Sequence, residues 1–368
     1  MQRAELLDKT GRWEECRDDL LRLAAEPATP PAMLGATIEK LIRHDAIDDA
    51  AGVWKTLSDR TPQTPAVYAL EAQLAVAQGD QPTAIEALRK LYAIAAKQAD
   101  NQDQLLKVVA LMEKLGFDQA ADKTLAAVAE KSPTGMLARA GFLARHDRAP
   151  EAFDLLDSNR KLLPPEQFVR AAVSLLKEAG TAATTADADR VNQWFAAARQ
   201  ADPDGLDLAM LEAELLTAVA RNQDAVAAYR KMLTQEKLST SQQVILKNNL
   251  AMLLAHPETA AEAQSLAEEA IAAVGAVPSL LDTRGLALLA RGDSHAAVEV
   301  LREAVLANSP AISLHLACAL AADKDLEGAR QALLEARKVG LVESRLEPDD
   351  RERIKALQAI LGAPAAGS

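Results

Sequence analysis

The chain has 368 residues, of which 49% are hydrophobic, 3% aromatic and 26% charged, and its formal net charge is −12. This balance excludes a disordered polar chain, and an acidic surface disfavours a nucleic-acid partner because it repels phosphate. No apolar run approaches the ~20 residues that span a bilayer, and no signal peptide is visible after Met1. We therefore expect a cytoplasmic protein without a membrane span.

Small and apolar residues recur at helical spacing along the chain, which predicts an all-α fold of helix-turn-helix hairpins. The expected hairpins lie near residues 1–25, 31–60, 65–98, 101–131, 134–162, 165–202, 205–236, 240–275, 279–307 and 310–339. An amphipathic helix near 348–361 is expected to cap the last hairpin, because an array of hairpins needs a terminal element with one polar face.

The hairpins differ in regularity along the chain. We expect degenerate hairpins over 1–204, clearer repeats over 205–340, the capping helix within 341–361 and a disordered tail over 362–368. In the first hairpin the opening turn is missing, which predicts either a ragged start or a piece of a longer protein. The sixth hairpin carries a polar insertion, 181–187, which is predicted to be a surface loop.

The ends of the helices are marked by their residue types. Thr64 and Ser309 each precede a proline, which predicts an N-cap followed by proline at the first helical position. Gly79 and Gly292 fall at turns within hairpins, where glycine accepts the left-handed conformation at low cost. Gly285 lies inside a helix and predicts a close crossing, because glycine there costs roughly 1 kcal/mol relative to alanine.

A repeat of 34 residues is visible in the second half of the chain. It relates four pairs of small or apolar residues: Ala251 and Gly285, Leu254 and Leu288, Ala263 and Ala297, and Ala270 and Ala304. In this period and in its pattern of small residues the chain resembles the tetratricopeptide (TPR) repeat family, bacterial type, most strongly from 205 to 340. The resemblance implies an α-solenoid of about ten stacked hairpins that binds other proteins.

The resemblance also implies a concave groove lined by the first helix of each hairpin. Transferred to this chain, the lining positions are Val169, Val173, Leu176, Met210, Glu214, Asn248, Met252, Asp282, Leu286 and Leu289, with Asn249 beside them. Some TPR proteins hold a peptide's C-terminal carboxylate with Lys and Asn in the groove, but here Met210, Glu214 and Asp282 take those places. The apolar members either contact a partner or pack within the superhelix, and methionine favours an adaptable binding surface.

The sequence contains no constellation that predicts catalysis or a bound metal or cofactor. The five histidines lack metal-ligand spacing, and Cys16 and Cys318 support neither a disulfide framework nor a zinc site. Two Arg-His-Asp triplets, at 43–45 and 145–147, are interpreted as turns, and Asp349 with Asp350 as a solvated helix face. No phosphate-binding or nucleophile motif is present.

The sequence therefore predicts a protein-interaction scaffold that binds a partner peptide or helix in the groove. Two alternatives stay open: the repeat arm of a larger enzyme, such as a kinase or glycosyltransferase, and a self-association module that forms homo-oligomers. Helical RNA-binding repeats are disfavoured by the net charge of −12.

Overall fold

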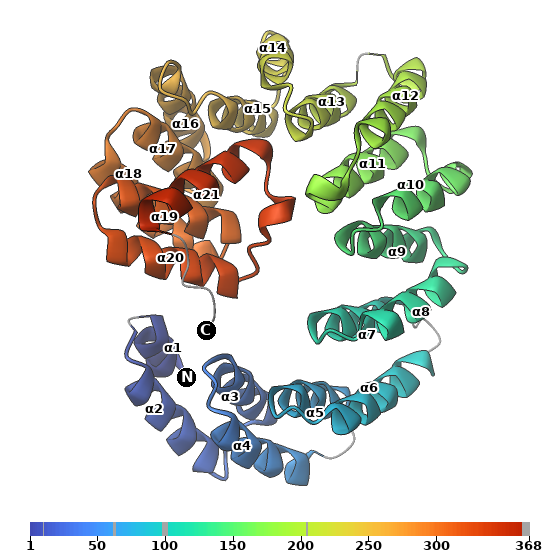
Figure 1. The fold of residues 1–368 in the computed structure, drawn as a ribbon, viewed down its shortest axis with the longest axis vertical. Helices are drawn as coiled ribbons and strands as arrows, with labels where there is room; N and C mark the ends of the chain where they lie inside the picture. The colour runs from blue at the N-terminus through green and yellow to red at the C-terminus, as the bar shows by residue number, and fades with distance from the viewer. Residues whose placement is uncertain (10, 62–63, 98–101, 204, 363–368) are drawn as a thin grey trace. The chain divides into compact units, whose positions relative to one another are not determined.

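A computed structural model describes residues 1–368 except 10, 62–63, 98–101, 204 and 363–368 (Figure 1). The described residues are helical and contain no strand. The helices of the first half are α1 (Gln2–Lys9), α2 (Trp13–Ala25), α3 (Pro31–Arg43), α4 (Ile47–Arg60), α5 (Pro65–Ala77), α6 (Gln81–Ala96), α7 (Gln102–Lys114), α8 (Asp118–Ala129), α9 (Pro133–Arg145) and α10 (Ala149–Ser158).

The second half continues the same order. Its α-helices are α11 (Pro165–Ala179), α12 (Thr185–Ala201), α13 (Leu206–Ala218), α14 (Asn222–Leu233), α15 (Thr240–Leu253), α16 (Ala260–Val274), α17 (Pro278–Ala290), α18 (Ser294–Ala304), α19 (Pro310–Ala322), α20 (Leu326–Lys338) and α21 (Pro348–Leu361). Four short 3₁₀ helices lie between them: η1 (Arg160–Leu162), η2 (Gly180–Ala182), η3 (Val305–Ala307) and η4 (Glu343–Arg345).

Consecutive helices pack as pairs, from α1 with α2 to α19 with α20, which confirms the predicted TPR-like α-solenoid. The predicted hairpin bounds fall within a few residues of the helix ends. The hydroxyl of Thr64 accepts a hydrogen bond from the backbone N–H of Val67 at 3.3 Å, and Ser309 caps α19 in the same way. Gly79 and Gly292 have φ of 75° and 87°, as their turn positions predict.

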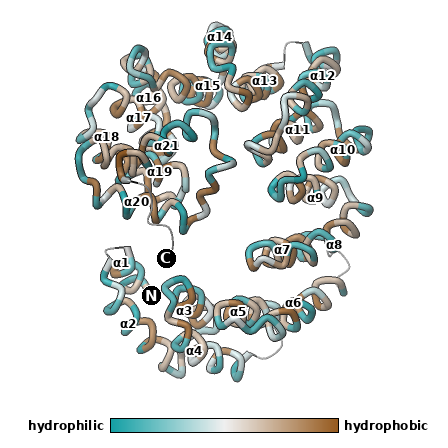
Figure 2. Tube along the Cα trace, in the orientation of Figure 1, coloured by the Kyte–Doolittle hydropathy of each residue, from teal (hydrophilic) through white to brown (hydrophobic). Residues whose placement is uncertain are grey.

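The described chain divides into two compact units, Met1–Arg139 (unit 1) and Ala140–Ser368 (unit 2), with the boundary inside α9. In each unit the core is built from small and aliphatic side chains of adjacent pairs. The alternation of hydrophilic and hydrophobic stretches along most helices in Figure 2 reflects burial of one face of each helix. α19 is an exception, because it is drawn mostly in the hydrophobic colour and is buried along most of its length.

Gly285 in α17 lies at a close crossing, as the repeat predicts. A Cβ added there would lie 2.5 Å from Cγ of Leu301 in α18, and Leu301 is itself fully buried. The two helices of this pair therefore approach to a distance that leaves no room for a side chain at position 285.

The predicted surface loop 181–187 is wrong in its second half. Residues 185–187 form the first turn of α12, and Thr184 caps that helix. The hydroxyl of Thr184 accepts from the N–H of Asp187 at 3.2 Å, while the Asp187 carboxylate accepts from the N–H of Thr184 at 2.9 Å. This reciprocal capping box converts a small, polar stretch into a helix start. Of the predicted disordered tail, 363–368 lie outside the described residues.

Candidate functional site

The segment that follows α20 returns along unit 2 and contacts helices far from it in sequence. We call residues 341–361, which include η4 and α21, the C-terminal strap. In Figure 1 the chain leaves α20, reaches toward α11 through η4 and then comes back as α21. η4 packs against α11 and η2, and α21 packs against α19.

The far end of the strap is fixed at α11 and α9. A guanidinium N–H of Arg345 donates to the backbone carbonyl of Arg145 at 2.7 Å, at the C-terminus of α9, where a cation is favoured by the helix dipole. Gly180, with φ of 52°, lies directly against the strap, because an added Cβ would meet the carbonyl of Ser344 and approach Cα of Arg345 to 2.8 Å. Only glycine satisfies both the backbone conformation and this close approach.

The middle of the strap is acidic and meets polar groups from three elements of unit 2. The carboxylate of Glu347 lies 3.9 Å from the ammonium of Lys177 in α11, which also donates to Glu214 at 3.0 Å. Asp349 accepts from the side-chain amide of Asn222, the first residue of α14, at 3.1 Å.

The imidazole of His256, which follows α15, lies 3.3 Å from the second carboxylate oxygen of Asp349. The strap is therefore held by side chains from α11, α14 and the end of α15.

The near end of the strap contains a buried ionic cluster. His315 of α19 is 1% exposed, and its Nδ1 lies 2.7 Å from Asp282 of α17 while its Nε2 lies 3.0 Å from Asp350 of the strap. Arg353 donates to the same Asp350 carboxylate at 2.7 Å. One imidazole thus contacts two carboxylates, that of Asp282 from α17 at one ring nitrogen and that of Asp350 from the strap at the other.

The cluster shifts the pKa values of His315 and Asp350. Burial alone lowers the pKa of His315, but the charge and hydrogen bonds of Asp282 and Asp350 outweigh burial and raise it to about 9. Burial likewise raises the pKa of Asp350, and the hydrogen bonds and charges of His315 and Arg353 outweigh it and lower the pKa to about 2. At neutral pH the cluster therefore holds an imidazolium at His315 beside the ionised carboxylate of Asp350.

Behind this cluster the strap buries apolar side chains. Ile354 and Leu357 of α21 are each 2% exposed and belong to the same core as α17–α20, with Leu341, Leu346 and Leu361 packed around it. This contact explains why α19 is buried along most of its length. The last helix therefore covers the end of the array, as a capping helix does, and also forms the anchored part of the strap.

The predicted groove residues fall into two groups. Val169, Val173, Leu176, Asp282 and Leu286 are buried, whereas Met210, Glu214, Asn248, Asn249, Met252 and Leu289 are half-buried. Of the two alternatives for the apolar members, Leu286 follows packing within the superhelix: it is 2% exposed, because α17 is packed among α15, α16, α18 and α19. Met210 and Leu289 pack against core clusters.

The polar members of the predicted groove make contacts between neighbouring pairs. Asn249 donates to the hydroxyl of Tyr229 at 3.3 Å, and Asn248 accepts from the hydroxyl of Thr283 at 2.7 Å. Glu214 and Asp282 hydrogen-bond to Lys177 and His315, the same two side chains that face the strap. Two of the predicted residues therefore lie directly beside the strap, and a role of the set in binding a partner stays a prediction.

The interpretation of Asp350 as part of a solvated helix face is wrong: it is 7% exposed because it pairs with His315 and Arg353. The sequence assigns no role to His315. Its signal in the sequence is its place in the otherwise apolar run Pro310–Ala322, where a buried imidazole requires a partner.

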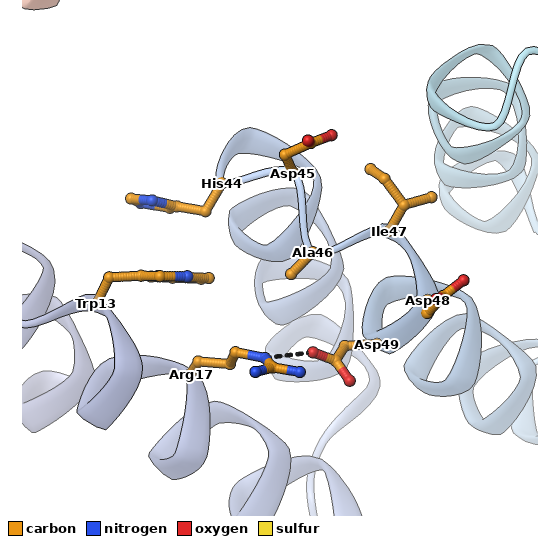
Figure 3. A pocket seen from close by; sticks show the side chains of 8 residues that line it. All are labelled: Trp13, Arg17, His44, Asp45, Ala46, Ile47, Asp48 and Asp49. Carbon is orange, nitrogen blue, oxygen red and sulfur yellow. Dashed lines mark hydrogen bonds and ion pairs between the residues drawn. The ribbon is translucent and has the colours of Figure 1, made fainter.

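Unit 1 contains a separate open hollow of about 330 Å³ (Figure 3). The rings of Trp13 and His44 stack there with centroids 3.8 Å apart, and Arg17 forms an ion pair with Asp49 at 2.5 Å. His44 also hydrogen-bonds Asp8 at 2.7 Å. Trp13, His44, Arg17 and Asp49 in this hollow thus already have partners within unit 1, and the strap is the better candidate site.

Within the described part of the chain, no group of three or more His, Cys, Asp or Glu side chains is arranged to hold a metal ion. None of the described helices is both long and apolar enough to cross a bilayer.

The described residues thus form an α-solenoid of TPR-like helix pairs in which the last segment is bound along unit 2. No family model matches the chain, and no curated protein matches it. Among solved structures, it is similar to a tetratricopeptide repeat protein from Parabacteroides merdae ATCC 43184, with 14% identity, a TM-score of 0.44, and coverage of 75% of this chain and 99% of that one.

It is also similar to Naa15/Naa10 bound to HypK-THB, with 15% identity, a TM-score of 0.31, and coverage of 100% of this chain and 68% of that one. Likenesses at this level give no argument about partners. The fold assignment therefore rests on the helix pairs themselves, and the bacterial type stays a prediction.

Proposed function

We propose that this chain is a protein-interaction scaffold, and that unit 2 binds an extended segment of a partner protein along the side chains that now hold the strap. We call these side chains the strap-binding face; they are Lys177, Asn222, His256 and His315. The observation that carries the proposal is the strap itself: unit 2 already binds a peptide segment through side chains from four elements.

The physical basis is the way in which stacked pairs present side chains. Successive pairs present polar groups toward the strap, so an extended segment meets a series of contacts rather than one pocket. Lys177, Asn222 and His256 are all partly exposed, and a partner can therefore reach them once the strap moves.

A selection from a random peptide library tests this proposal. The full chain is the bait, and each enriched peptide is measured again on a double variant, Lys177→Glu with Asn222→Asp, that reverses or adds charge on the strap-binding face. We expect peptides that bind the parent chain and lose tenfold or more affinity on the variant, which corresponds to about 1.4 kcal/mol or more.

The matched control reverses the charge of an exposed lysine in unit 1, Lys55→Glu, and is expected to leave binding unchanged. If no peptide is enriched, or if the enriched peptides bind the double variant as well as the parent, unit 2 is not a peptide-binding scaffold on this face.

A further inference from the structure

We infer that the partner of unit 2 presents an acidic turn that leads into an amphipathic helix, and that the strap occupies the place of this partner segment in the chain alone. The inference rests on the proposed function, and it adds the chemistry of the partner and the identity of its competitor.

The first argument is charge complementarity in an acidic protein. The formal net charge of the chain is −12, yet the strap-binding face gathers an ammonium, an amide and two imidazoles. The strap meets them with three carboxylates in a stretch of four residues, Glu347, Asp349 and Asp350. Two carboxylates of the solenoid, Glu214 and Asp282, are already paired with Lys177 and His315, and they orient these cations rather than repel the strap.

The second argument is the imidazole of His315. Asp282 holds its Nδ1, which directs Nε2 toward the strap. Without an acidic occupant, this imidazole would lose one of its two carboxylates while remaining in an apolar helix. Leaving a buried charged group without its hydrogen-bond partner is costly. A segment with a neutral residue at this place is therefore rejected, and His315 is the residue that determines specificity.

The third argument is the apolar spacing after the buried acid. Ile354 and Leu357 follow Asp350 by four and seven positions, which places them on one side of α21 and into the core beside α19. An occupant must therefore bring two adjacent acidic residues at the first turn of a helix and two apolar residues further along the same face.

The strap is held less well at Glu347 than at Asp350. The surroundings of Glu347 raise the pKa of its carboxyl, because burial disfavours the charged form more than Lys177 favours it, and the ion pair is 3.9 Å long. The strap is thus bound strongly at Asp350 and weakly at Glu347. The strap is tethered, so it competes with a free partner at an effective concentration of the order of millimolar. A partner must therefore bind unit 2 with higher affinity than the strap does, or the strap must be loosened first.

The test uses the full chain and a labelled peptide with the sequence of residues 341–361, followed by fluorescence polarisation. The parent chain is expected to bind this peptide weakly because its own strap competes. In Asp349→Lys the contacts to Asn222 and His256 are lost, the strap is loosened, and binding of the peptide is expected to be tenfold tighter or more. Asp349 is half-buried at the surface, so the fold should tolerate this change, and Asp349→Asn repeats the test with a side chain of the same size.

Two controls isolate the recognition of the carboxylates. Asp59→Lys makes the same change of charge on an exposed position of α4 and is expected to bind the peptide as weakly as the parent. A labelled peptide with Asp350→Asn is expected to lose tenfold or more affinity for the loosened chain, because a neutral amide cannot form an ion pair with the His315 imidazolium.

Three results would overturn the inference. Equal binding by the parent, Asp349→Lys and Asp349→Asn would show that the strap and the peptide do not compete. Equal affinity of the Asp350→Asn peptide and the unchanged peptide for the loosened chain would show that unit 2 does not recognise the buried carboxylate. A loosened chain that doubles in mass by light scattering would assign the face to a second copy rather than to a different partner. In each case the proposed function would still hold if library peptides bind the parent chain and lose affinity on the double variant Lys177→Glu with Asn222→Asp.

Discussion

Each unit contains a histidine that is held by an aspartate of the preceding pair, but the two histidines differ in exposure and in their other partners. In unit 1, His44 lies 2.7 Å from Asp8, its side chain is 29% exposed, and its ring stacks on Trp13. In unit 2, His315 lies 2.7 Å from Asp282, is 1% exposed, and has Asp350 on its other nitrogen. The second carboxylate comes from the strap and converts a contact between neighbours into a buried cluster.

The comparison separates two kinds of contact in a repeat protein. Asp8 with His44 and Asp282 with His315 are 36 and 33 residues apart, close to the repeat period of the chain. Asn222 with Asp349 is 127 residues apart, and Arg345 with Arg145 is 200. The period thus accounts for contacts between adjacent pairs, and the contact of Asp350 with His315, 35 residues apart, follows it as well. The contacts of the strap with Asn222 and Arg145 lie far outside the period.

The largest expected effect is the difference in free energy of unfolding between the variants His315→Ala and His44→Ala. His315→Ala leaves two buried carboxylates facing each other, and loss of one member of a buried ionic cluster costs roughly 3–5 kcal/mol. His44→Ala removes a partly exposed pair, worth at most about 1 kcal/mol. Urea unfolding of the two variants measures the difference. A similar loss of stability in both would show that the strap adds nothing to the aspartate–histidine pair.

The cluster also predicts a pH dependence that belongs to unit 2. The pKa of His315 is raised from 6.5 to about 9, so its contribution to stability is complete below pH 6.5 and is lost as the pH rises to 9. The pKa of Asp350 is lowered from 3.8 to about 2, so its contribution is complete above pH 3.8 and is lost as the pH falls to 2.

Thermal unfolding of the parent chain and of His315→Ala across this range measures the effect. The difference in stability between the two proteins is expected to be greatest between pH 4 and 6.5 and to shrink on both sides. A difference that stays constant up to pH 10 would contradict the raised pKa of His315.

A smaller contrast is expected between two helix glycines. Gly285→Ala places a methyl group 2.5 Å from Cγ of Leu301, and overpacking of this kind costs about 1–3 kcal/mol. Gly52 of α4 has nothing within 4 Å of an added Cβ, so Gly52→Ala is expected to stabilise by up to about 1 kcal/mol through helix propensity. Urea midpoints that move in the same direction for both variants would contradict the close crossing.

Much of the fold could be predicted from the sequence because it depends on local and periodic signals. The caps at Thr64 and Ser309, the turns at Gly79 and Gly292, and the crossing at Gly285 are each determined by residue type within one repeat. The strap could not be predicted in this way. Asp349 and Asp350 have the pattern of an exposed first turn, and only the position of His315 in three dimensions shows that one of them is buried.

The candidate site was predicted only in outline. Glu214 and Asp282 were placed correctly on the first helices of their pairs, but their partners Lys177 and His315 were not identified. The sequence leaves two alternatives open for the apolar positions, and for Leu286 the burial of α17 among its neighbours decides for packing within the superhelix. Enclosure depends on how several helices pack around one another, and a single helix pattern carries no information about it.

The hydrogen bond from Arg345 to the carbonyl of Arg145 has a consequence for how unit 2 unfolds. An array held only by nearest-neighbour contacts unfolds in steps, and its terminal helices fray on their own. A contact between the last segment of unit 2 and its first helix closes a loop of 200 residues. This contact couples the two ends of unit 2, and we expect it to make their unfolding more cooperative than that of an open array.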